Sequence, residues 1–240
     1  MNVIGSFDFG RIIKTLLPGL VFLAALIALM DCAIILLRGS SLITPWIAAN
    51  TTLAGVMAVP LAITLGLLSN TLFFYVLHGQ LIQRPLHSRY PDLLKAEEEL
   101  RQAAIEEMIN ELPTPYRSNS LKTATDAGAL LLPHMNLSAL AITREGFWFY
   151  LEFQLNMALG IVFAWLATIS TTFIARTHLG LTVGSWIITS VVLSVVSVSL
   201  VMMLIGAARM NYYYYRRRLL SLRIAALLNG SKNMLKNELE

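Results

Sequence analysis

The chain has 240 residues, of which 56% are hydrophobic and 13% charged, with 18 lysines and arginines against 14 acidic residues. A water-soluble domain carries about a quarter charged residues, because its surface must be solvated. This composition excludes an ordinary soluble domain and indicates that lipid covers much of the surface. The single cysteine, Cys32, also excludes an intrachain disulfide and a cysteine metal cluster.

Four apolar runs are long enough to cross a bilayer, since about 20 helical residues span its roughly 30 Å hydrocarbon core. They cover residues 15–37, 46–77, 147–175 and 180–208. The sequence therefore predicts an all-α polytopic membrane protein with four transmembrane helices, a mostly helical cytoplasmic insertion and a C-terminal cytoplasmic helix. The predicted segments are 1–79 for an N-terminal interfacial segment and helices 1 and 2, 80–146 for the insertion, 147–208 for helices 3 and 4, and 209–240 for a basic tail.

Basic residues are distributed unevenly along the chain. Of the 18 lysines and arginines, only Arg38 and Arg176 fall in the two short loops between spans, and the N-terminal segment, the insertion and the tail hold the rest. Cytoplasmic loops carry the excess of Lys and Arg in membrane proteins. Both termini and the insertion are therefore predicted to be cytoplasmic, with the spans in the cytoplasmic (inner) membrane.

Small and polar residues recur every four positions on the second and third spans. On the second span this ridge ends in Gly66 and Asn70; on the third it consists of Glu152, Asn156, Gly160, Ala164 and Thr168. Small residues at this spacing let helices approach closely, and polar ones hydrogen-bond across the contact. We expect the two ridges to pack on each other, with the two asparagines paired. An ion or proton path along them is the alternative. Near the outer end of the first span, Asp31 is expected to reach the interface or to pair with Arg38.

Residues 91–112 form the clearest helix outside the membrane. Pro91 suits the first helical position, and Asp92 suits the first turn, near the positive end of the helix dipole. With two basic and seven acidic residues the segment has a net charge of −5. Such a face is usually just solvated, but the helix also has an apolar stripe that needs a partner, for which the basic tail is the obvious candidate. The stripe comprises Ala96, Leu100, Ala104, Met108 and Leu112, of which Leu100, Ala104 and Met108 are candidate docking residues.

The fourth span combines a hydroxyl face with a basic end. Its face carries Ser190, Ser194 and Ser197, which can bond to the backbone one turn earlier and need no function, although a pore lining is the alternative. The end comprises Tyr212, Tyr213, Tyr214 and Tyr215, followed by Arg216, Arg217 and Arg218. Tyrosines settle at the headgroup level, and arginines anchor the cytoplasmic side and attract anionic lipid headgroups. No separate base-stacking or groove-entering element is visible, which argues against nucleic acid.

The sequence carries no recognisable catalytic or metal-binding motif. Its four histidines, His78, His87, His134 and His178, are scattered, and no phosphate-binding glycine loop is present. We therefore expect no cofactor, no metal and no enzymatic activity. The favoured interpretation is a non-catalytic membrane subunit that self-associates, anchors a cytoplasmic protein partner, or does both. An oligomeric pore or membrane-permeabilising effector is the alternative, and an intramembrane enzyme is less favoured.

Overall fold

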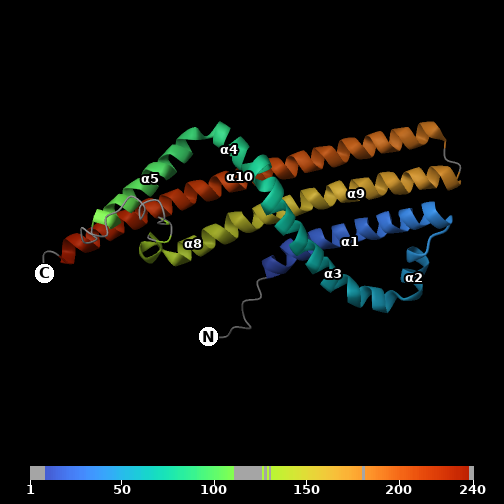
Figure 1. Ribbon diagram of the computed structural model, residues 1–240, viewed down its shortest axis with the longest axis horizontal. Helices are drawn as coiled ribbons and strands as arrows, with labels where there is room; N and C mark the ends of the chain where they lie inside the picture. Colours follow the sequence, from blue (N-terminus) through green and yellow to red (C-terminus); the bar gives the residue numbers. More distant parts are fainter. Residues whose placement is uncertain (1–8, 111–125, 127–128, 130, 180–181, 238–240) are drawn as a thin grey trace. The chain divides into compact units, whose positions relative to one another are not determined.

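The computed structural model describes residues 9–110, 126, 129, 131–179 and 182–237, and these residues form helices and their connections only (Figure 1). Within these ranges, four helical stretches are long and apolar enough to cross a membrane: Lys14–Arg38, Thr51–Leu77, Leu137–Ile174 and Val183–Asn229. The prediction of an all-α chain with four such helices is confirmed. The third stretch begins ten residues before the predicted run at 147, and the fourth extends well past its predicted end at 208.

The chain divides into two compact units. Unit 1 comprises Met1–Ile82 and Phe149–Met210, and unit 2 comprises Gln83–Trp148 and Asn211–Glu240. Helix α10 (Val183–Asn237) contributes to both units. The fourth apolar span and the tail are therefore one continuous helix rather than two helices joined by a turn.

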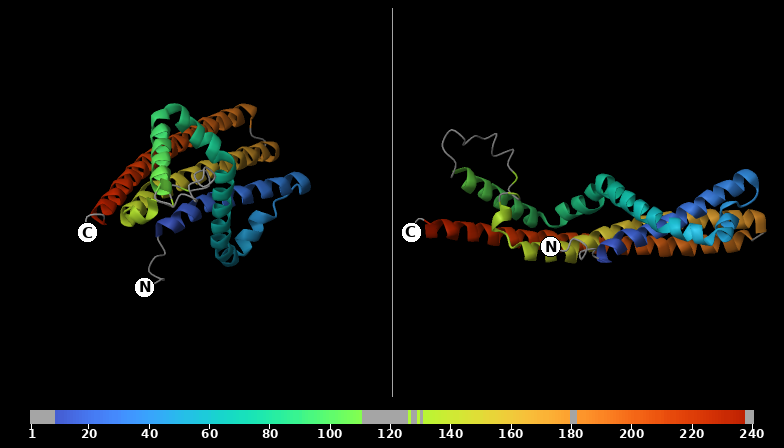
Figure 2. Two further views of the ribbon diagram at one scale, coloured as in Figure 1. Left: turned by 60° about the vertical axis from the view of Figure 1, so that its left-hand side comes forward. Right: turned by 90° about the horizontal axis from the view of Figure 1, so that it is seen from below.

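Unit 1 is organised around α1 (Phe9–Arg38), which contacts both α3 (Thr51–Leu72) and α9 (Phe149–Leu179). Figures 1 and 2 show α1 and α9 running side by side, with α3 crossing them obliquely. Two glycines permit the crossing. A Cβ on Gly19 would collide with the carbonyl oxygen of Ala62, and one on Gly66 would collide with that of Thr15.

The glycines of the two predicted ridges do not pack on each other. Gly66 of α3 lies against the backbone of Thr15 in α1, and a Cβ on Gly160 of α9 would lie 3.3 Å from Val21 Cγ1, also in α1. The prediction that these glycines bring the second and third spans together is wrong. The spacing identified faces that allow close approach, but the glycines of both faces use α1 as their partner, because a small-residue ridge specifies close packing without specifying which helix packs.

A short helix, α2 (Ile43–Ala49), interrupts the second apolar run, which was predicted to be one span over 46–77. The backbone of Asn50 is not helical (φ −127°, ψ 43°), and α3 begins at Thr51. Asparagine favours helix ends because its side chain bonds to nearby backbone groups. Here its Nδ2 donates to the carbonyl oxygen of Trp46 at 2.9 Å.

The carboxylate of Asp31 holds the start of α2. It accepts hydrogen bonds from Ser41 Oγ at 2.7 and 2.8 Å, from the Ile43 backbone N at 3.1 Å, and from Thr44 Oγ1 at 2.7 Å. The expected pairing with Arg38 is not observed: across the described ranges, Asp31 forms no ion pair. The sequence pattern missed this arrangement because the donors lie after the span, in the connection and in the first residues of α2.

The chain leaves α3 through two π-helical segments, Phe73–Leu77 and Gly79–Gln83, and then enters α4 (Arg84–Arg89). Pro85 has no N–H to donate to the carbonyl oxygen of Leu81, four residues earlier. Arg209 of α10 supplies the missing donor, with its Nε 2.8 Å from that oxygen. Arg209 therefore satisfies a backbone group that proline leaves open.

Unit 2 is built from α4, α5 (Pro91–Asn110), α8 (Leu137–Thr143) and the last part of α10. A π-helical segment, Arg144–Trp148, follows α8. Figures 1 and 2 show α5 beside the end of α10. The core of the unit consists of Ala104, Ile105, Ile109, Leu131, Met135 and Ala226, with Leu140, Leu219, Leu222 and Leu227 packed against it. The acidic helix and the basic tail thus pack together within one chain, as the apolar stripe predicted.

The buried face of α5 differs from the predicted stripe. Ala104 is fully buried as expected, but the core continues with Ile105 and Ile109, and Leu100 is only half-buried. Four residues turn the helix by about 400°, so each successive member of a four-residue repeat lies about 40° further around the helix. Such a stripe therefore moves away from a partner that packs straight along the helix. Leu112 and the side chain of Met108 lie outside the described part of the structure.

Candidate functional site

Arg216 is the central polar contact between α5 and the tail of α10. Its Nε donates to Glu97 Oε1 at 2.8 Å, its Nη2 donates to Glu97 Oε2, and its Nη1 donates to the Tyr212 hydroxyl at 2.9 Å. A guanidinium that engages both oxygens of a carboxylate fixes orientation as well as charge. Because both side chains are largely buried, Arg216 is committed to the interior of unit 2 and is not available to lipid headgroups.

The four tyrosines of the tail also turn inward in part. Tyr213 stacks on Tyr90 with ring centroids 4.1 Å apart, and Trp148 lies near Tyr215 at 5.3 Å and Tyr212 at 6.4 Å. Tyr212 is buried. The Tyr212 ring therefore packs inside unit 2 and does not itself face lipid, while the predicted headgroup depth of the four rings stays a prediction. The sequence could not reveal this cluster because Tyr90 and Trp148 lie far from the tail along the chain.

The remaining members of the predicted docking set stay accessible. Arg217 and Arg218 are exposed, and Tyr214 is 44% exposed while also contacting Phe147, with ring centroids 6.2 Å apart. Their exposure follows from helix geometry: the side of α10 that carries Tyr212 and Arg216, four residues apart, faces inward and leaves the neighbouring positions outside. Of the predicted lipid-docking residues on the tail, Tyr214, Arg217 and Arg218 are thus the exposed ones.

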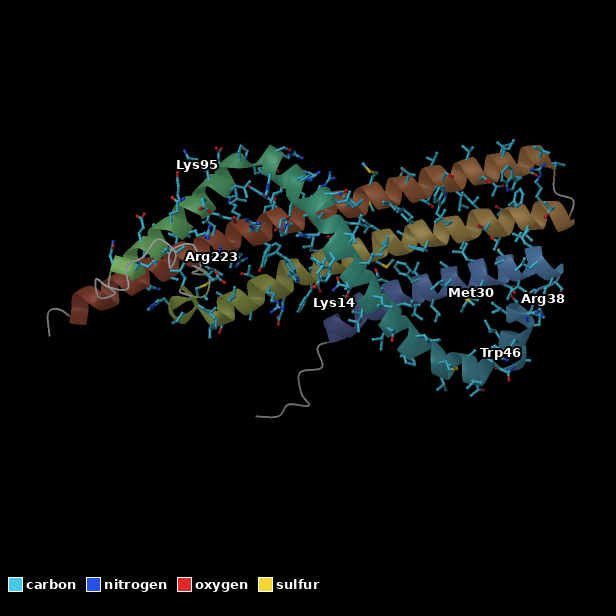
Figure 3. All side chains as sticks on the ribbon, viewed as in Figure 1. Lys14, Met30, Arg38, Trp46, Lys95 and Arg223 are labelled. Carbon is cyan, nitrogen blue, oxygen red and sulfur yellow. The ribbon has the colours of Figure 1, made fainter. Side chains whose placement is uncertain are left out.

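A cavity of about 440 Å³ lies between α5 and the tail of α10. Four of the charged residues that line it already form ion pairs with each other: Glu97 with Arg216, and Glu98 with Arg101 at 3.4 Å. Arg223 and His87 also line it, and neither forms a hydrogen bond or ion pair with any residue in the described ranges. Figure 3 shows Arg223 on α10 and Lys95 on the outer side of α5. The cavity thus offers two unengaged basic side chains beside leucines.

The outer face of α5 is charged. Asp92, Glu99 and Glu106 recur every seven residues, which places them on one side of the helix, and all three are exposed. The Lys95 ammonium lies 3.7 Å from Glu99 Oε1, but these side chains are 78% and 66% exposed, so the pair adds little stability. Since the core residues of α5 occupy its other side, this acidic face is not needed to fold unit 2.

Among the described residues of unit 1, one charged pair lies within the apolar helices. Lys14 Nζ of α1 pairs with Glu152 Oε2 of α9, and the same ammonium lies 4.3 Å from the centroid of the Phe149 ring. The side chains of Lys14 and Glu152 are 17% and 11% exposed. A charge at such a position is costly unless it is paired. Sequence reasoning assigned Lys14 only to the cytoplasmic margin and so missed this partner.

The predicted amide pair is present beside it. Asn156 Nδ2 lies 3.4 Å from Asn70 Oδ1, and Ser69 Oγ donates to Asn156 Oδ1 at 3.1 Å. Asn156 is almost completely buried, so these partners satisfy a side chain that would otherwise be costly in an apolar setting. Ser69 was not anticipated, because it neighbours Asn70 and lies off the four-residue ridge.

The hydroxyl face of α10 points toward α9. Ser194 Oγ accepts from Trp165 Nε1 at 3.0 Å and donates to the carbonyl oxygen of Ser190 at 2.7 Å. Ser190 and Ser197 are half-buried on the same side. Thr168 of α9 donates to the carbonyl oxygen of Ala164 at 2.7 Å, one turn earlier, as serine and threonine commonly do in apolar helices. Ser194 thus joins α10 to α9 through Trp165, whereas Thr168 bonds within its own helix.

Across the described ranges, no three histidine, cysteine, aspartate or glutamate side chains gather where they could hold a metal ion. No protein-family model, curated protein or solved structure matches the chain.

Proposed function

We propose that the chain is a non-catalytic subunit of the cytoplasmic membrane whose spans hold unit 2 in the cytoplasm as a docking module for a protein partner. One observation carries the proposal. Unit 2 closes its apolar core with its own helices, yet α5 keeps Asp92, Glu99 and Glu106 exposed along one side. A face that is not required for folding is free to bind.

The chemistry of this face favours a basic partner surface. Three carboxylates at seven-residue spacing extend over about 21 Å of helix, at 1.5 Å per residue, which suits a basic helix or strand lying along α5. Exposed charges contribute mainly to association rate and partner choice, and less to affinity. Apolar contacts at the margins of the face would supply the remaining affinity.

Exposed arginines support the proposed orientation. Arg217 and Arg218 of the tail are exposed, as are Arg84, Arg89 and Arg144, each within eight residues of a boundary between the two units. Arginines at such boundaries favour the cytoplasmic side, and each adds about 1 kcal/mol of attraction to an anionic leaflet. Anionic headgroups are therefore the lipid partner that we propose, with Arg217 and Arg218 rather than Arg216 as the contacts on the tail.

Self-association is a second candidate, and its supporting observation lies on α10. Val191, Val192, Val195 and Val198 are all more than half exposed. Branched side chains on a span pack against lipid or against a second copy of the chain. The pore alternative has less support, because Ser194 is already engaged by Trp165 within the chain.

Site-specific photocrosslinking in intact cells tests these roles separately. A photoreactive residue at position 99 should capture a second protein, and Glu106→Lys should reduce that capture while Ser88→Lys, at an exposed position off α5, should not. The same residue at position 195 should capture another copy of the chain if it self-associates. Absence of any product from positions 92, 99 and 106 would overturn the docking proposal, whatever the result at position 195.

A further inference from the structure

A cavity of about 540 Å³ lies in unit 1, where α1 approaches the start of α2. Most of its wall is apolar and includes Ala28, Ile35 and Ile174, while Asp31 and Cys32 also line it. Figure 3 labels Arg38 at the end of α1 and Trp46 on α2, the two helices that border this region. Its volume lies within the range of about 300–1,000 Å³ that is typical of small-molecule pockets.

Asp31 is a buried anion in this cavity, and its charge has no counterion there. The side chain is 8% exposed, and Ser41, Ile43 and Thr44 donate to its two oxygens. Three donors stabilise a carboxylate in its ionised form, but they are neutral and leave the negative charge uncompensated. In the part of the chain that the structure describes, no Lys, Arg or His pairs with it.

The wall decides what kind of cation fits. A hard metal cation requires about six oxygen ligands, whereas the hydroxyls of Ser41 and Thr44 already donate to the carboxylate and most of the remaining wall is apolar. An organic ammonium suits both the carboxylate and the apolar wall, since its charge can lie near Asp31 and its carbon body against Ala28, Ile35 and Ile174. We propose that this cavity binds an organic ammonium group through the carboxylate of Asp31. The proposal is independent of the docking role of unit 2.

Cys32 provides a reporter inside the same cavity. It is the only cysteine of the chain, it lines the cavity and it is 5% exposed, so its reaction with a small thiol reagent measures access to the cavity. In bilayer discs of phosphatidylglycerol, which has no ammonium group, millimolar benzyltrimethylammonium should slow modification of Cys32 by methyl methanethiosulfonate at least threefold. Its uncharged isostere neopentylbenzene, in which carbon replaces the charged nitrogen, should have no comparable effect.

Two variants test the roles of charge and space. Asp31→Asn keeps the shape of the side chain and removes its charge, so it should abolish the protection of Cys32. Ala28→Leu fills the cavity and leaves the carboxylate and its donors unchanged, so the protection should also be lost. A melting curve for each variant establishes that it is folded, and Ala28→Leu keeps the test valid if Asp31→Asn fails to fold.

A lipid or a free amine can supply the same ammonium chemistry, and the bilayer composition distinguishes them. If a lipid headgroup occupies the cavity, Cys32 of the parent should react more slowly in phosphatidylethanolamine discs than in phosphatidylglycerol discs, and Asp31→Asn should remove the difference. Protection only by added benzyltrimethylammonium would assign the site to a free amine. Equal protection by neopentylbenzene, protection that persists in Asp31→Asn, or no protection in either lipid would overturn the proposal.

Discussion

The two units hold their helices together by different means. In unit 1, α1 approaches α3 so closely that Gly19 and Gly66 touch the opposing backbone, and contacts such as the Asn70–Asn156 amide pair add polar bonds. In unit 2, α5 is held by Ile105, Ile109 and the leucines of the tail. In the proposed topology this difference follows the solvent. Lipid around unit 1 would remove the gain from burying apolar side chains, so close backbone contact takes its place, whereas in water around unit 2 apolar burial stabilises directly.

The largest expected effect comes from filling a close backbone contact in unit 1. Gly66→Leu places a side chain where the carbonyl oxygen of Thr15 lies, so α1 and α3 must separate. Overpacking costs about 1–3 kcal/mol and occasionally more, and a direct collision with backbone belongs at or above the top of that range. Thermal unfolding in detergent should show a large loss of stability.

The matched control is Gly55→Leu, also in α3, where a Cβ meets nothing within 4 Å. It should melt close to the parent. If both variants melt alike, close backbone contact is not what holds unit 1, and the contrast between the two units fails.

A smaller effect is expected in unit 2, at the contact between Glu97 and Arg216. Glu97→Gln leaves a guanidinium without its carboxylate, and loss of one partner from a buried pair costs about 3–5 kcal/mol. Because the Arg216 side chain is 23% exposed, water compensates in part, and we expect about 2 kcal/mol. Hydrogen exchange along α5 should rise, while exchange in unit 1 should stay near the parent level.

The double variant Glu97→Leu with Arg216→Met sharpens this test. It replaces the pair by apolar side chains and leaves no charge unpaired, so much of the lost stability should return. If the double variant is as unstable as the single one, the pair contributes more than orientation, and apolar burial is not what chiefly stabilises unit 2.

The features that sequence predicted best are those that a local pattern determines. The four apolar helices, the start of α5 near Pro91 and the pairing of Asn70 with Asn156 follow from run length, cap chemistry and spacing. Which helix packs against a given face is not determined by the local sequence. Gly66 was correctly marked as a close-contact position, but its spacing could not indicate that Thr15 of α1, rather than α9, lies opposite.

The partners of the tail residues could not be predicted from the local sequence either. A run of tyrosines and arginines after an apolar helix is typical of a membrane anchor, and Arg217 and Arg218 remain exposed as that pattern predicts. Tyr212 and Arg216 turn inward because Trp148 and Glu97 lie beside them, and both partners are more than 60 residues away along the chain. An electrostatic pattern read along one helix therefore could not anticipate side chains contributed by another.

The smallest expected effect concerns Trp165 and Ser194, the hydrogen bond that joins α9 to the hydroxyl face of α10 at 3.0 Å. Ser194→Ala should cost about 0.6 kcal/mol, the average for hydrogen bonds between membrane helices, because the indole N–H finds other partners in the unfolded state. A double-mutant cycle with Trp165→Phe isolates the pair, and a coupling energy near zero would show that the two helices are held by packing alone. The same variants also test the pore alternative. If the serine face lines a conducting path, Ser194→Ala should change ion leak through liposomes containing the protein, whereas a purely structural bond should change only the melting temperature.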